Sequence, residues 1–274
     1  MTAYARPDDL ETALGLMADG TRRVLAGGTD LYPGAGAELA GPVLDISALP
    51  GLRGITHDGG LRIGAATTWA AIAEADLPPA LAGLQQAARQ VGARQVQNAG
   101  TIGGNLCNAS PAADGVPPLL TLEASVELMS RRGVRRMGLG AFLQGPRKTA
   151  RAADEVLTAV LIPEAALRGQ GGFLKLGARS YLVISIAMVA GRIVTEGGRV
   201  TEIALAVGAC SPVAQRLARV ERALLGAPAD RLADLVTAAD VEAALAPIAD
   251  VRATAGYRAE AAVELVRRVV GGLA

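Results

Sequence analysis

Two loops built on paired glycines constrain this sequence more than any other feature. The first covers residues 25–31 and directly follows a short apolar run, and the second covers residues 99–106. Paired glycines lack the Cβ atoms that keep a ligand away from the main chain, so successive N–H groups can converge on an anion. Paired glycines also form tight turns, so either loop alone has a purely structural explanation. Together, the two loops favour a site in which the backbone binds a diphosphate.

Polar side chains accompany the second loop. Between residues 92 and 114 the helical spacing of apolar residues stops, and the sequence becomes rich in Gly, Asn, Ser and Thr. We therefore expect a long loop here, and long loops in compact domains are usually functional or disordered. The apolar residues Ile102 and Leu106 favour a functional loop. The side chains able to contact a polar ligand are Asn98, Asn105, Asn108, Ser110 and Asp114.

The residues needed for several other chemistries are missing from the sequence. His57 is the single histidine and lies in a Thr-His-Asp-Gly-Gly stretch typical of an exposed turn, which argues against a Ser-His-Asp or Cys-His site. Cys107 and Cys210 are far apart and form no CxxC pair, so this chain alone cannot build a zinc site or an iron–sulfur cluster. No GxxxxGK(S/T) motif is present, which excludes the phosphate loop of nucleoside triphosphatases.

Charge and composition argue against nucleic-acid and membrane partners. The 274 residues include 27 Lys+Arg and 26 Asp+Glu, so no field of one sign attracts nucleic acid or anionic lipid. Aromatic residues make up 3%, too few for the stacking platforms that bind single strands. The longest apolar run, residues 183–190, is far shorter than the ~20 residues of a membrane span. Two cysteines and an N-terminal sequence without a basic and then apolar leader predict a cytoplasmic protein.

The spacing of apolar residues predicts two structural units. The first mixes helices and strands, the second is a small sheet followed by helices, and the best boundary is the stretch 164–172. The first unit is expected to contain helices at 8–18, 67–74 and 79–91 and strands at 23–26, 43–46, 61–63, 126–130, 134–137 and 155–162. The second is expected to contain a hairpin at 184–194 and 200–208 and helices at 215–225, 230–245 and 254–270.

Five segments together resemble one known family. They are AGGTDL at 26–31, IGAATTW at 63–69, AGTIGGNLCNASPAAD at 99–114, FLQGPRKTARAADEVLTAVLIP at 142–163 and FLKLGARSYLVISIAMVA at 173–190. These segments are similar to the FAD-binding medium subunit of the molybdenum hydroxylases, a family that includes bacterial xanthine dehydrogenases and carbon monoxide dehydrogenase flavoproteins. The resemblance covers nearly the whole chain.

The resemblance implies a fold and a domain division. The fold class is α+β, with a two-part FAD-binding domain of the vanillyl-alcohol-oxidase-like flavoprotein type at residues 1–167. A smaller α+β C-terminal domain of antiparallel sheet and helices would follow at residues 168–274. This division agrees with the boundary expected from the spacing of apolar residues.

The resemblance also assigns residues to parts of noncovalently bound FAD. Residues 25–31 and 101–105 would form the two diphosphate loops, and the next residues would line the dinucleotide, contact ribityl, ribose or ring groups, or present backbone to the isoalloxazine. The implied cofactor-binding residues are Leu25, Ala26, Gly27, Gly28, Thr29, Asp30, Leu31, Ile63, Ala65, Thr101, Ile102, Gly103, Gly104, Asn105, Asn108, Ser110, Asp114, Val156, Leu157 and Lys175.

Two of these positions carry a further argument. Lys175 would reach the pyrimidine edge of the flavin, where a cation stabilises the anionic reduced ring; the alternative is a solvated lysine on an edge strand. Position 108 is Asn, where Thr is common in the eukaryotic enzymes of the family, and this change keeps the hydrogen-bonding capacity. The stretch 179–181 lacks the acidic run that accompanies NAD use, so the terminal electron acceptor stays open.

The function implied is that of an oxidoreductase subunit that relays electrons and has no catalytic acid or base of its own. Electrons would come from the [2Fe–2S] clusters of a small partner subunit, and a large partner subunit with a molybdenum cofactor would hydroxylate the substrate, in a dimer of heterotrimers. One alternative is a self-contained flavin-dependent oxidase or reductase of the same cofactor-binding fold. Another is an interaction subunit whose glycine loops are only turns.

Overall fold

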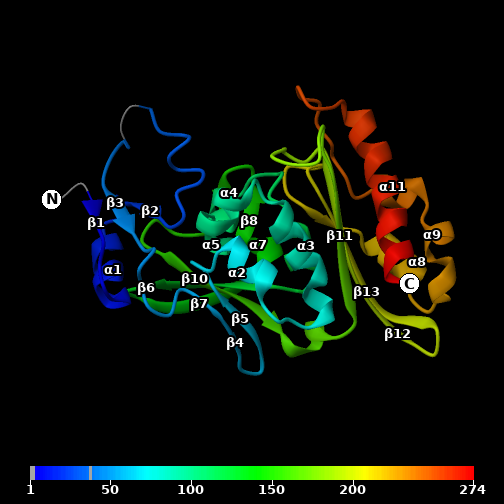
Figure 1. The fold of residues 1–274 in the computed structure, drawn as a ribbon, viewed down its shortest axis with the longest axis horizontal. Coiled ribbons are helices and arrows are strands. Elements are labelled where there is room, and N and C mark those ends of the chain that lie inside the picture. Colours follow the sequence, from blue (N-terminus) through cyan, green and yellow to red (C-terminus); the bar gives the residue numbers. More distant parts are fainter. Residues whose placement is uncertain (1–3, 37–38) are drawn as a thin grey trace.

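The computed structural model describes residues 4–36 and 39–274, so residues 1–3, 37 and 38 of the expected FAD-binding domain lie outside the described residues. Along its long axis the molecule has three parts (Figure 1). A small N-terminal sheet with one helix is followed by a central sheet covered by helices, and then by a C-terminal sheet with its own helices. The chain is therefore an α+β protein, as the sequence predicts.

The N-terminal part is a three-stranded parallel sheet with the order β1-β3-β2. Its strands are β1 (Tyr4–Ala5), β2 (Arg23–Leu25) and β3 (Val43–Asp45). Helix α1 (Leu10–Met17) begins as the sequence predicts, because the Asp9 carboxylate accepts a hydrogen bond from the Thr12 amide at 2.7 Å. The first glycine loop leaves this sheet directly after β2, so its first residues are held in place by the pairing of β2 with β3.

The central part is a five-stranded antiparallel sheet with the order β4-β5-β10-β6-β7. Its strands are β4 (Ile55–His57), β5 (Gly60–Gly64), β6 (Ser125–Ser130), β7 (Gly133–Gly138) and β10 (Val156–Pro163). β10 occupies the middle of the sheet, and its apolar sequence is buried as a central strand requires. The helices associated with this sheet are α2 (Trp69–Glu74), η1 (Pro79–Leu81), α3 (Ala82–Gln90), α6 (Val116–Thr121) and α7 (Leu139–Phe142).

The expectation of an irregular loop between residues 92 and 114 is wrong. The structure has two short helices there, α4 (Arg94–Ala99) and α5 (Ile102–Asn108). Thr101 caps α5 by accepting a hydrogen bond from the Gly104 amide, and Ile102 and Leu106 bury the same face of the helix in the core. Two glycines weaken helix propensity here, but tertiary packing overrides it.

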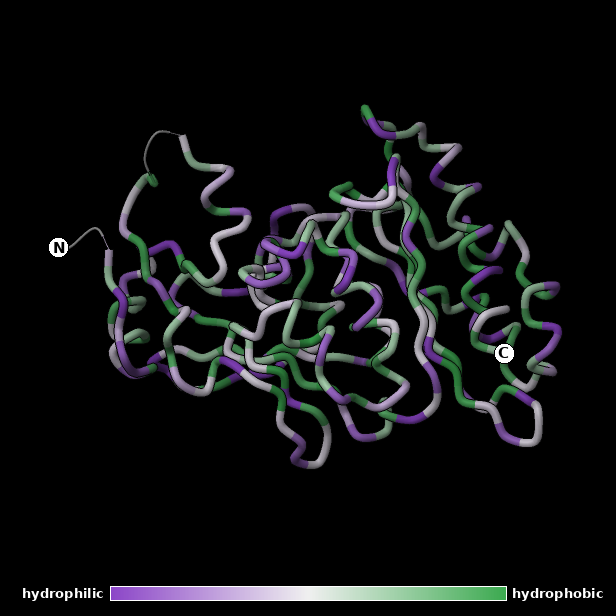
Figure 2. Tube along the Cα trace, viewed as in Figure 1, coloured by the Kyte–Doolittle hydropathy of each residue, from purple (hydrophilic) through white to green (hydrophobic). Residues whose placement is uncertain are grey.

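The C-terminal part is an antiparallel sheet with helices packed on it. Its strands follow the order of the chain: β11 (Gln170–Leu176), β12 (Ala187–Glu196), β13 (Arg199–Gly208) and β14 (Gln215–Arg216). Helices α8 (Ala218–Leu224), η3 (Ala229–Arg231), α9 (Leu232–Leu235), α10 (Ala238–Glu242) and α11 (Ala255–Leu273) complete it. Hydrophobic and hydrophilic residues alternate along α11, and its apolar face joins the core of this part (Figure 2).

Two helix predictions in this part differ from the structure. Residues 215 and 216 form the edge strand β14, so the helix expected at 215–225 begins only at Ala218. The single helix expected at 230–245 is broken into η3, α9 and α10, because the Thr237 hydroxyl accepts a hydrogen bond from the Asp240 amide and starts a new helix.

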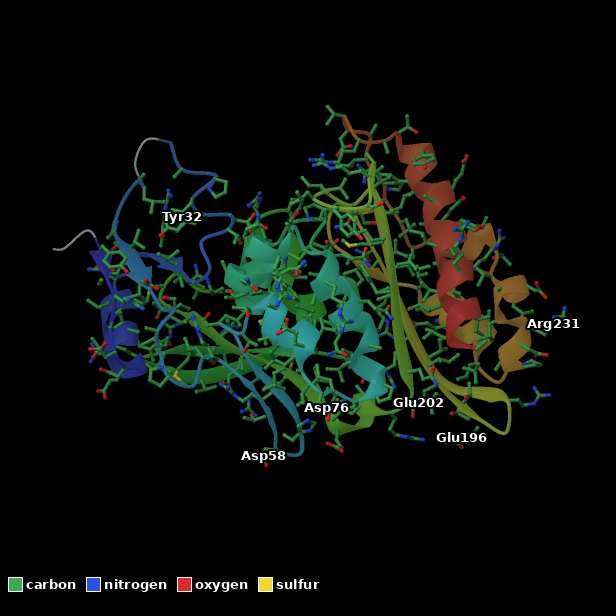
Figure 3. All side chains as sticks on the ribbon, in the orientation of Figure 1. Tyr32, Asp58, Asp76, Glu196, Glu202 and Arg231 are labelled. Carbon is green, nitrogen blue, oxygen red and sulfur yellow. The ribbon has the colours of Figure 1, made fainter. Side chains whose placement is uncertain are left out.

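Glycines bring the central and C-terminal parts close together. A Cβ on Gly171 would lie 2.2 Å from the Ala80 carbonyl oxygen, and a Cβ on Gly83 would lie 2.8 Å from the Gly172 carbonyl oxygen. Between the two parts, η2 (Glu164–Leu167) leads into β11. Arg168, which follows η2, pairs with two carboxylates at 3.0 Å, those of Glu196 and Glu202. Figure 3 labels both glutamates on the β12–β13 hairpin. The two parts therefore share a packed junction.

Among the described residues, no helix is both long enough and apolar enough to span a membrane.

Candidate functional site

A cavity of about 700 Å³ lies where segments of all three parts of the molecule meet. Its wall combines the first glycine loop, helix α5 and the segment that follows α5, residues near the start of β10, and the segment 182–184 of the C-terminal part. This volume is within the ~300–1,000 Å³ typical of small-molecule sites. The site is thus built from segments that are far apart in the sequence.

The first glycine loop presents open backbone donors to the cavity. None of the amides from residue 27 to residue 31 donates a hydrogen bond to another residue within 4–36 and 39–274. Gly28 adopts a φ of +70°, which favours glycine, and a Cβ on Gly27 would lie 1.9 Å from the Ala99 carbonyl oxygen. Tyr32, just beyond the loop, is labelled in Figure 3. The loop therefore packs on the end of α4 while its amides stay available to a ligand.

The second glycine pair has a different role from the one expected. The Gly103 amide donates to the Ala65 carbonyl at 2.8 Å, and the Gly104 amide donates to the Thr101 hydroxyl at 3.1 Å. A Cβ on Gly103 would lie 2.7 Å from the Ala65 Cβ. The missing side chain therefore lets α5 approach the end of β5, and these two amides are already bonded within the protein.

Two asparagines of α5 give the cavity wall its polar character. The side-chain oxygen of Asn105 is buried and has no hydrogen-bond partner among the described residues. Such an orphaned acceptor costs free energy unless a ligand or water satisfies it. Asn108 donates from Nδ2 to the Asp30 carboxylate at 2.9 Å and accepts a hydrogen bond from the Arg147 guanidinium.

At one side of the cavity, Asp114 forms a buried cluster with Lys175 and Ser185. The Lys175 ammonium and the Ser185 hydroxyl each lie 2.6 Å from a carboxylate oxygen of Asp114. The side chains of Lys175 and Asp114 are 5% and 8% exposed, so the alternative of a solvated lysine is wrong. Burial raises the pKa of the Asp114 carboxyl, and the Lys175 charge opposes that rise. Lys175 is thus an ion-pair partner instead of a lone cation.

The structure brings most of the predicted site residues together. Of the residues that the sequence predicts to contact the ligand, all line the cavity except Ile63, Asn98, Ile102 and Lys175. Asn98 lies exposed on α4, outside the wall. The side chains of Ile63 and Ile102 are fully buried in the central core. Lys175 reaches the wall only through Asp114.

Sequence reasoning missed several wall residues, above all three arginines. Arg23 ends up at the wall from β2, and Arg147 and Arg151 come from the segment around the ribbon β8 (Leu143–Gly145) and β9 (Lys148–Thr149). The signal available in the sequence was the basic stretch RKTAR at 147–151. Apolar wall residues that were also missed are Trp69, Val91, Val96, Leu182, Val183 and Ile184.

The charges on the wall leave an excess of positive charge. Glu155 is paired with Arg135 at 2.6 Å, which holds the pKa of the Glu155 carboxyl below its usual range, and Asp114 is paired with Lys175. Neither partner cation, Arg135 or Lys175, is itself a wall residue, so once these two pairs are set aside the described wall carries three arginines and one remaining carboxylate, that of Asp30. This excess of two positive charges matches the charge of a diphosphate.

Comparison with known proteins agrees with the geometry. Residues 1–165 match the family model of the FAD binding domain in molybdopterin dehydrogenase. The chain belongs to this flavoprotein family. Residues 172–273 of the flavoprotein match the model of the CO dehydrogenase flavoprotein C-terminal domain.

Individual relatives are similar over at least four fifths of their length. The flavoprotein is 31% identical to the xanthine dehydrogenase FAD-binding subunit of Escherichia coli O157:H7, over 98% of this chain and 94% of that one. It is 35% identical to the nicotinate dehydrogenase FAD-subunit of Eubacterium barkeri, over 82% and 80% of the two chains. A chain of the Cu,Mo-CO dehydrogenase structure superposes with a TM-score of 0.90 at 29% identity, covering 98% of this chain and 96% of that one.

Proposed function

We propose that this chain binds one FAD noncovalently in the cavity and acts as the electron-transfer subunit of a molybdenum-containing hydroxylase. The observation that carries the proposal is that residues 27–31 line a cavity with an excess of positive charge while their amides donate to no other described residue. Each hydrogen bond to a charged group contributes ~1.5–3 kcal/mol, so several amides can hold a diphosphate without a lysine. Family membership supports the same cofactor.

Each part of the wall suits one part of the dinucleotide. The first glycine loop would hold the diphosphate, and Asn105, with its orphaned oxygen, would accept a hydrogen bond from a hydroxyl of the ligand. Val156 and Leu157, at the start of the central strand β10, would contact the isoalloxazine. The predicted site residues that line the cavity are proposed as a cofactor site on these grounds.

Bound FAD supplies one- and two-electron chemistry, and the chain's own residues position it. Asp114 holds the Lys175 ammonium by an ion pair at 2.6 Å, so the pair presents a fixed dipole near the wall. Because Asp114 offsets the charge of Lys175, the stabilisation of a reduced ring is smaller than for an unpaired cation. Leu182, Val183 and Ile184 give the cavity an apolar edge, at which the side chains of Leu182 and Ile184 remain exposed to solvent.

The partners proposed are a large subunit with the molybdenum cofactor and a small subunit with [2Fe–2S] clusters, assembled as a dimer of heterotrimers. A multi-subunit setting is supported by two relatives, which are named as an FAD-binding subunit of xanthine dehydrogenase and an FAD-subunit of nicotinate dehydrogenase. Within residues 4–36 and 39–274 there is no group of three or more His, Cys, Asp or Glu residues that could hold a metal ion. The domain division at 167/168 is proposed because η2 ends at Leu167 and β11 begins at Gln170. The cytoplasmic location stays a prediction.

Cofactor content tests the first half of the proposal. The purified chain should carry about one FAD, which acid or heat releases from the polypeptide. Flavin that remains attached after denaturation would contradict noncovalent binding. A well-folded chain that neither contains nor takes up FAD would contradict the proposed function altogether and favour an interaction subunit.

Reconstitution tests the second half. The chain alone should be reduced by dithionite and reoxidised by artificial acceptors, and substrate-dependent dye reduction should require the iron–sulfur and molybdenum subunits. If the chain with FAD alone turned over an organic substrate at ~1–10³ s⁻¹, it would be a self-contained oxidase or reductase instead.

A further inference from the structure

Arg147 is held in an unusual and well-defined position beside the cavity. It lies in the turn between β8 and β9 with a φ of +59°, a left-handed conformation that costs free energy for a residue with a Cβ. Its amide donates to the Ala109 carbonyl at 2.9 Å, and Ala109 is the residue that ends α5. This bond fixes the base of the Arg147 side chain next to the last turn of α5.

The guanidinium of Arg147 is oriented by Asn108. Arg147 donates from Nη1 to the side-chain oxygen of Asn108, and the Asn108 amide nitrogen donates to the Asp30 carboxylate at 2.9 Å. An asparagine side chain offers one accepting and one donating end, so these two partners determine which way the amide points. The chain Arg147–Asn108–Asp30 therefore connects the β8–β9 turn, helix α5 and the first glycine loop.

Arg147 differs from the other two wall arginines in what it can offer a ligand. Arg151 donates from Nη1 to the carbonyls of Ala152 and Glu155 and so supports its own turn. Arg23 is an exposed side chain of the wall, and within residues 4–36 and 39–274 no hydrogen bond or ion pair orients its guanidinium. Arg147 is oriented by Asn108, and its remaining N–H groups donate to no other described residue. Arg147 is therefore the arginine that is both positioned and available.

The first glycine loop also needs a cation. Asp30 belongs to the same loop as the open amides and places a negative charge beside any anion bound there. Like charges repel, and although the repulsion is moderated because Asp30 is exposed, a nearby cation would offset its effect on a bound anion. Arg147 is linked to Asp30 through a single side chain and can supply that charge.

We propose that Arg147 binds the diphosphate of the dinucleotide directly and that Asn108 is its positioning residue. The inference rests on the proposed FAD site and adds a side-chain contact to a diphosphate site otherwise formed by backbone. In this arrangement the Asn108 side-chain oxygen accepts from Arg147 while its nitrogen donates to Asp30, so both ends of the amide hold Arg147 in position. Arginine suits this task because its planar, permanently charged fork matches phosphate oxygens.

The test compares ligands with and without phosphate. FAD and riboflavin, which lacks phosphate, are titrated by fluorescence into the full chain, into Arg147→Gln and into Arg147→Lys. Arg147→Gln should lower FAD affinity roughly tenfold to a hundredfold, which corresponds to one charge-assisted contact, and leave riboflavin affinity unchanged. Arg147→Lys should recover part of the loss. Arg199→Gln is the matched control, because Arg199 is an exposed arginine of the β12–β13 hairpin that donates to one carbonyl.

The positioning role of Asn108 is tested by the affinity for FAD and by the salt dependence of FAD binding. Asn108→Ala should lower FAD affinity less than Arg147→Gln does, and it should keep the salt dependence of FAD binding, because the cation is still present. Arg147→Gln should flatten that salt dependence.

Three outcomes would overturn the inference. The first is that Arg147→Gln binds FAD as the parent does, and the second is an equal loss of FAD and riboflavin affinity in Arg147→Gln, which would indicate a structural role. Equal loss in Arg199→Gln would show that only overall charge matters. A parent chain that binds no FAD would instead refute the proposed function on which the inference rests.

Discussion

Removing the Lys175 ammonium tests the buried ion pair and predicts a distinctive dependence on pH. In Lys175→Met, the Asp114 carboxyl keeps its burial and its Ser185 hydrogen bond but loses the cation at 2.6 Å. Breaking a buried pair from one side typically costs about 3–5 kcal/mol of unfolding free energy. We expect about 3 kcal/mol near pH 8, because the carboxyl can limit the loss by taking up a proton at 1.36 kcal/mol per pKa unit.

The sign of the pH effect follows from the direction of the pKa shift. Burial already raises the pKa of Asp114 in the folded chain, so the contribution of this carboxyl to stability falls as the pH rises from its unfolded pKa of ~3.9 through its folded pKa. Without Lys175 the folded pKa rises further. The difference in stability between Lys175→Met and the parent should therefore be largest near pH 8 and shrink toward pH 5, where the carboxyl is protonated more easily.

The assay is denaturant unfolding of the parent and the variants at both pH values. Lys148→Met is the matched control, because Lys148 is the chain's other lysine and lies exposed on β9. The double variant Lys175→Met with Asp114→Asn should recover most of the lost stability, since no unpaired charge is then buried. Equal destabilisation of Lys175→Met at both pH values, or a double variant no more stable than the single one, would refute this reasoning.

Three further substitutions test the glycine loops and the cap of α5. Gly103→Val should destabilise the folded chain before it affects FAD, because even its Cβ would lie 2.7 Å from the Ala65 Cβ; a melting temperature equal to the parent's would contradict this. Gly27→Ala should weaken FAD binding in a fluorescence titration, because its Cβ would meet the Ala99 carbonyl at 1.9 Å and displace the loop; unchanged affinity would remove the loop from the site. Thr101→Ala should cost about 1 kcal/mol of unfolding free energy through loss of the α5 cap, and Thr101→Ser should restore it.

Local sequence signals predicted many elements correctly. Helices α1 and α2 lie within the expected ranges 8–18 and 67–74, where Asp9 and Thr68 cap their first turns, and the apolar run at 155–162 forms the central strand β10. These features depend on neighbours within a few residues, so their spacing in the sequence is informative. The C-terminal hairpin was predicted correctly for the same reason.

Helices α4 and α5 show where local signals fail. Glycines at positions 103 and 104 lower helix propensity, so the sequence indicates a loop. The structure compensates through contacts made far along the chain, because the Gly103 amide donates to Ala65 and the face of Ile102 packs in the central core. The spacing of apolar residues along the sequence does not predict these long-range contacts, and so it does not predict the two helices.

By itself, the sequence determined the family, the two glycine loops and the absence of residues for other chemistries. Only the tertiary structure decided how the site's charges are paired. Lys175 and Asp114 are 61 positions apart, and Asn108 and Asp30 are 78 positions apart. Local propensity depends on near neighbours, whereas an ion pair or a hydrogen bond at this separation exists only after the sheets and helices have packed. For that reason the sequence indicated Lys175 as an unpaired cation and gave no role to Arg147. In the folded chain Lys175 is paired with Asp114, and Arg147 is part of the cavity wall.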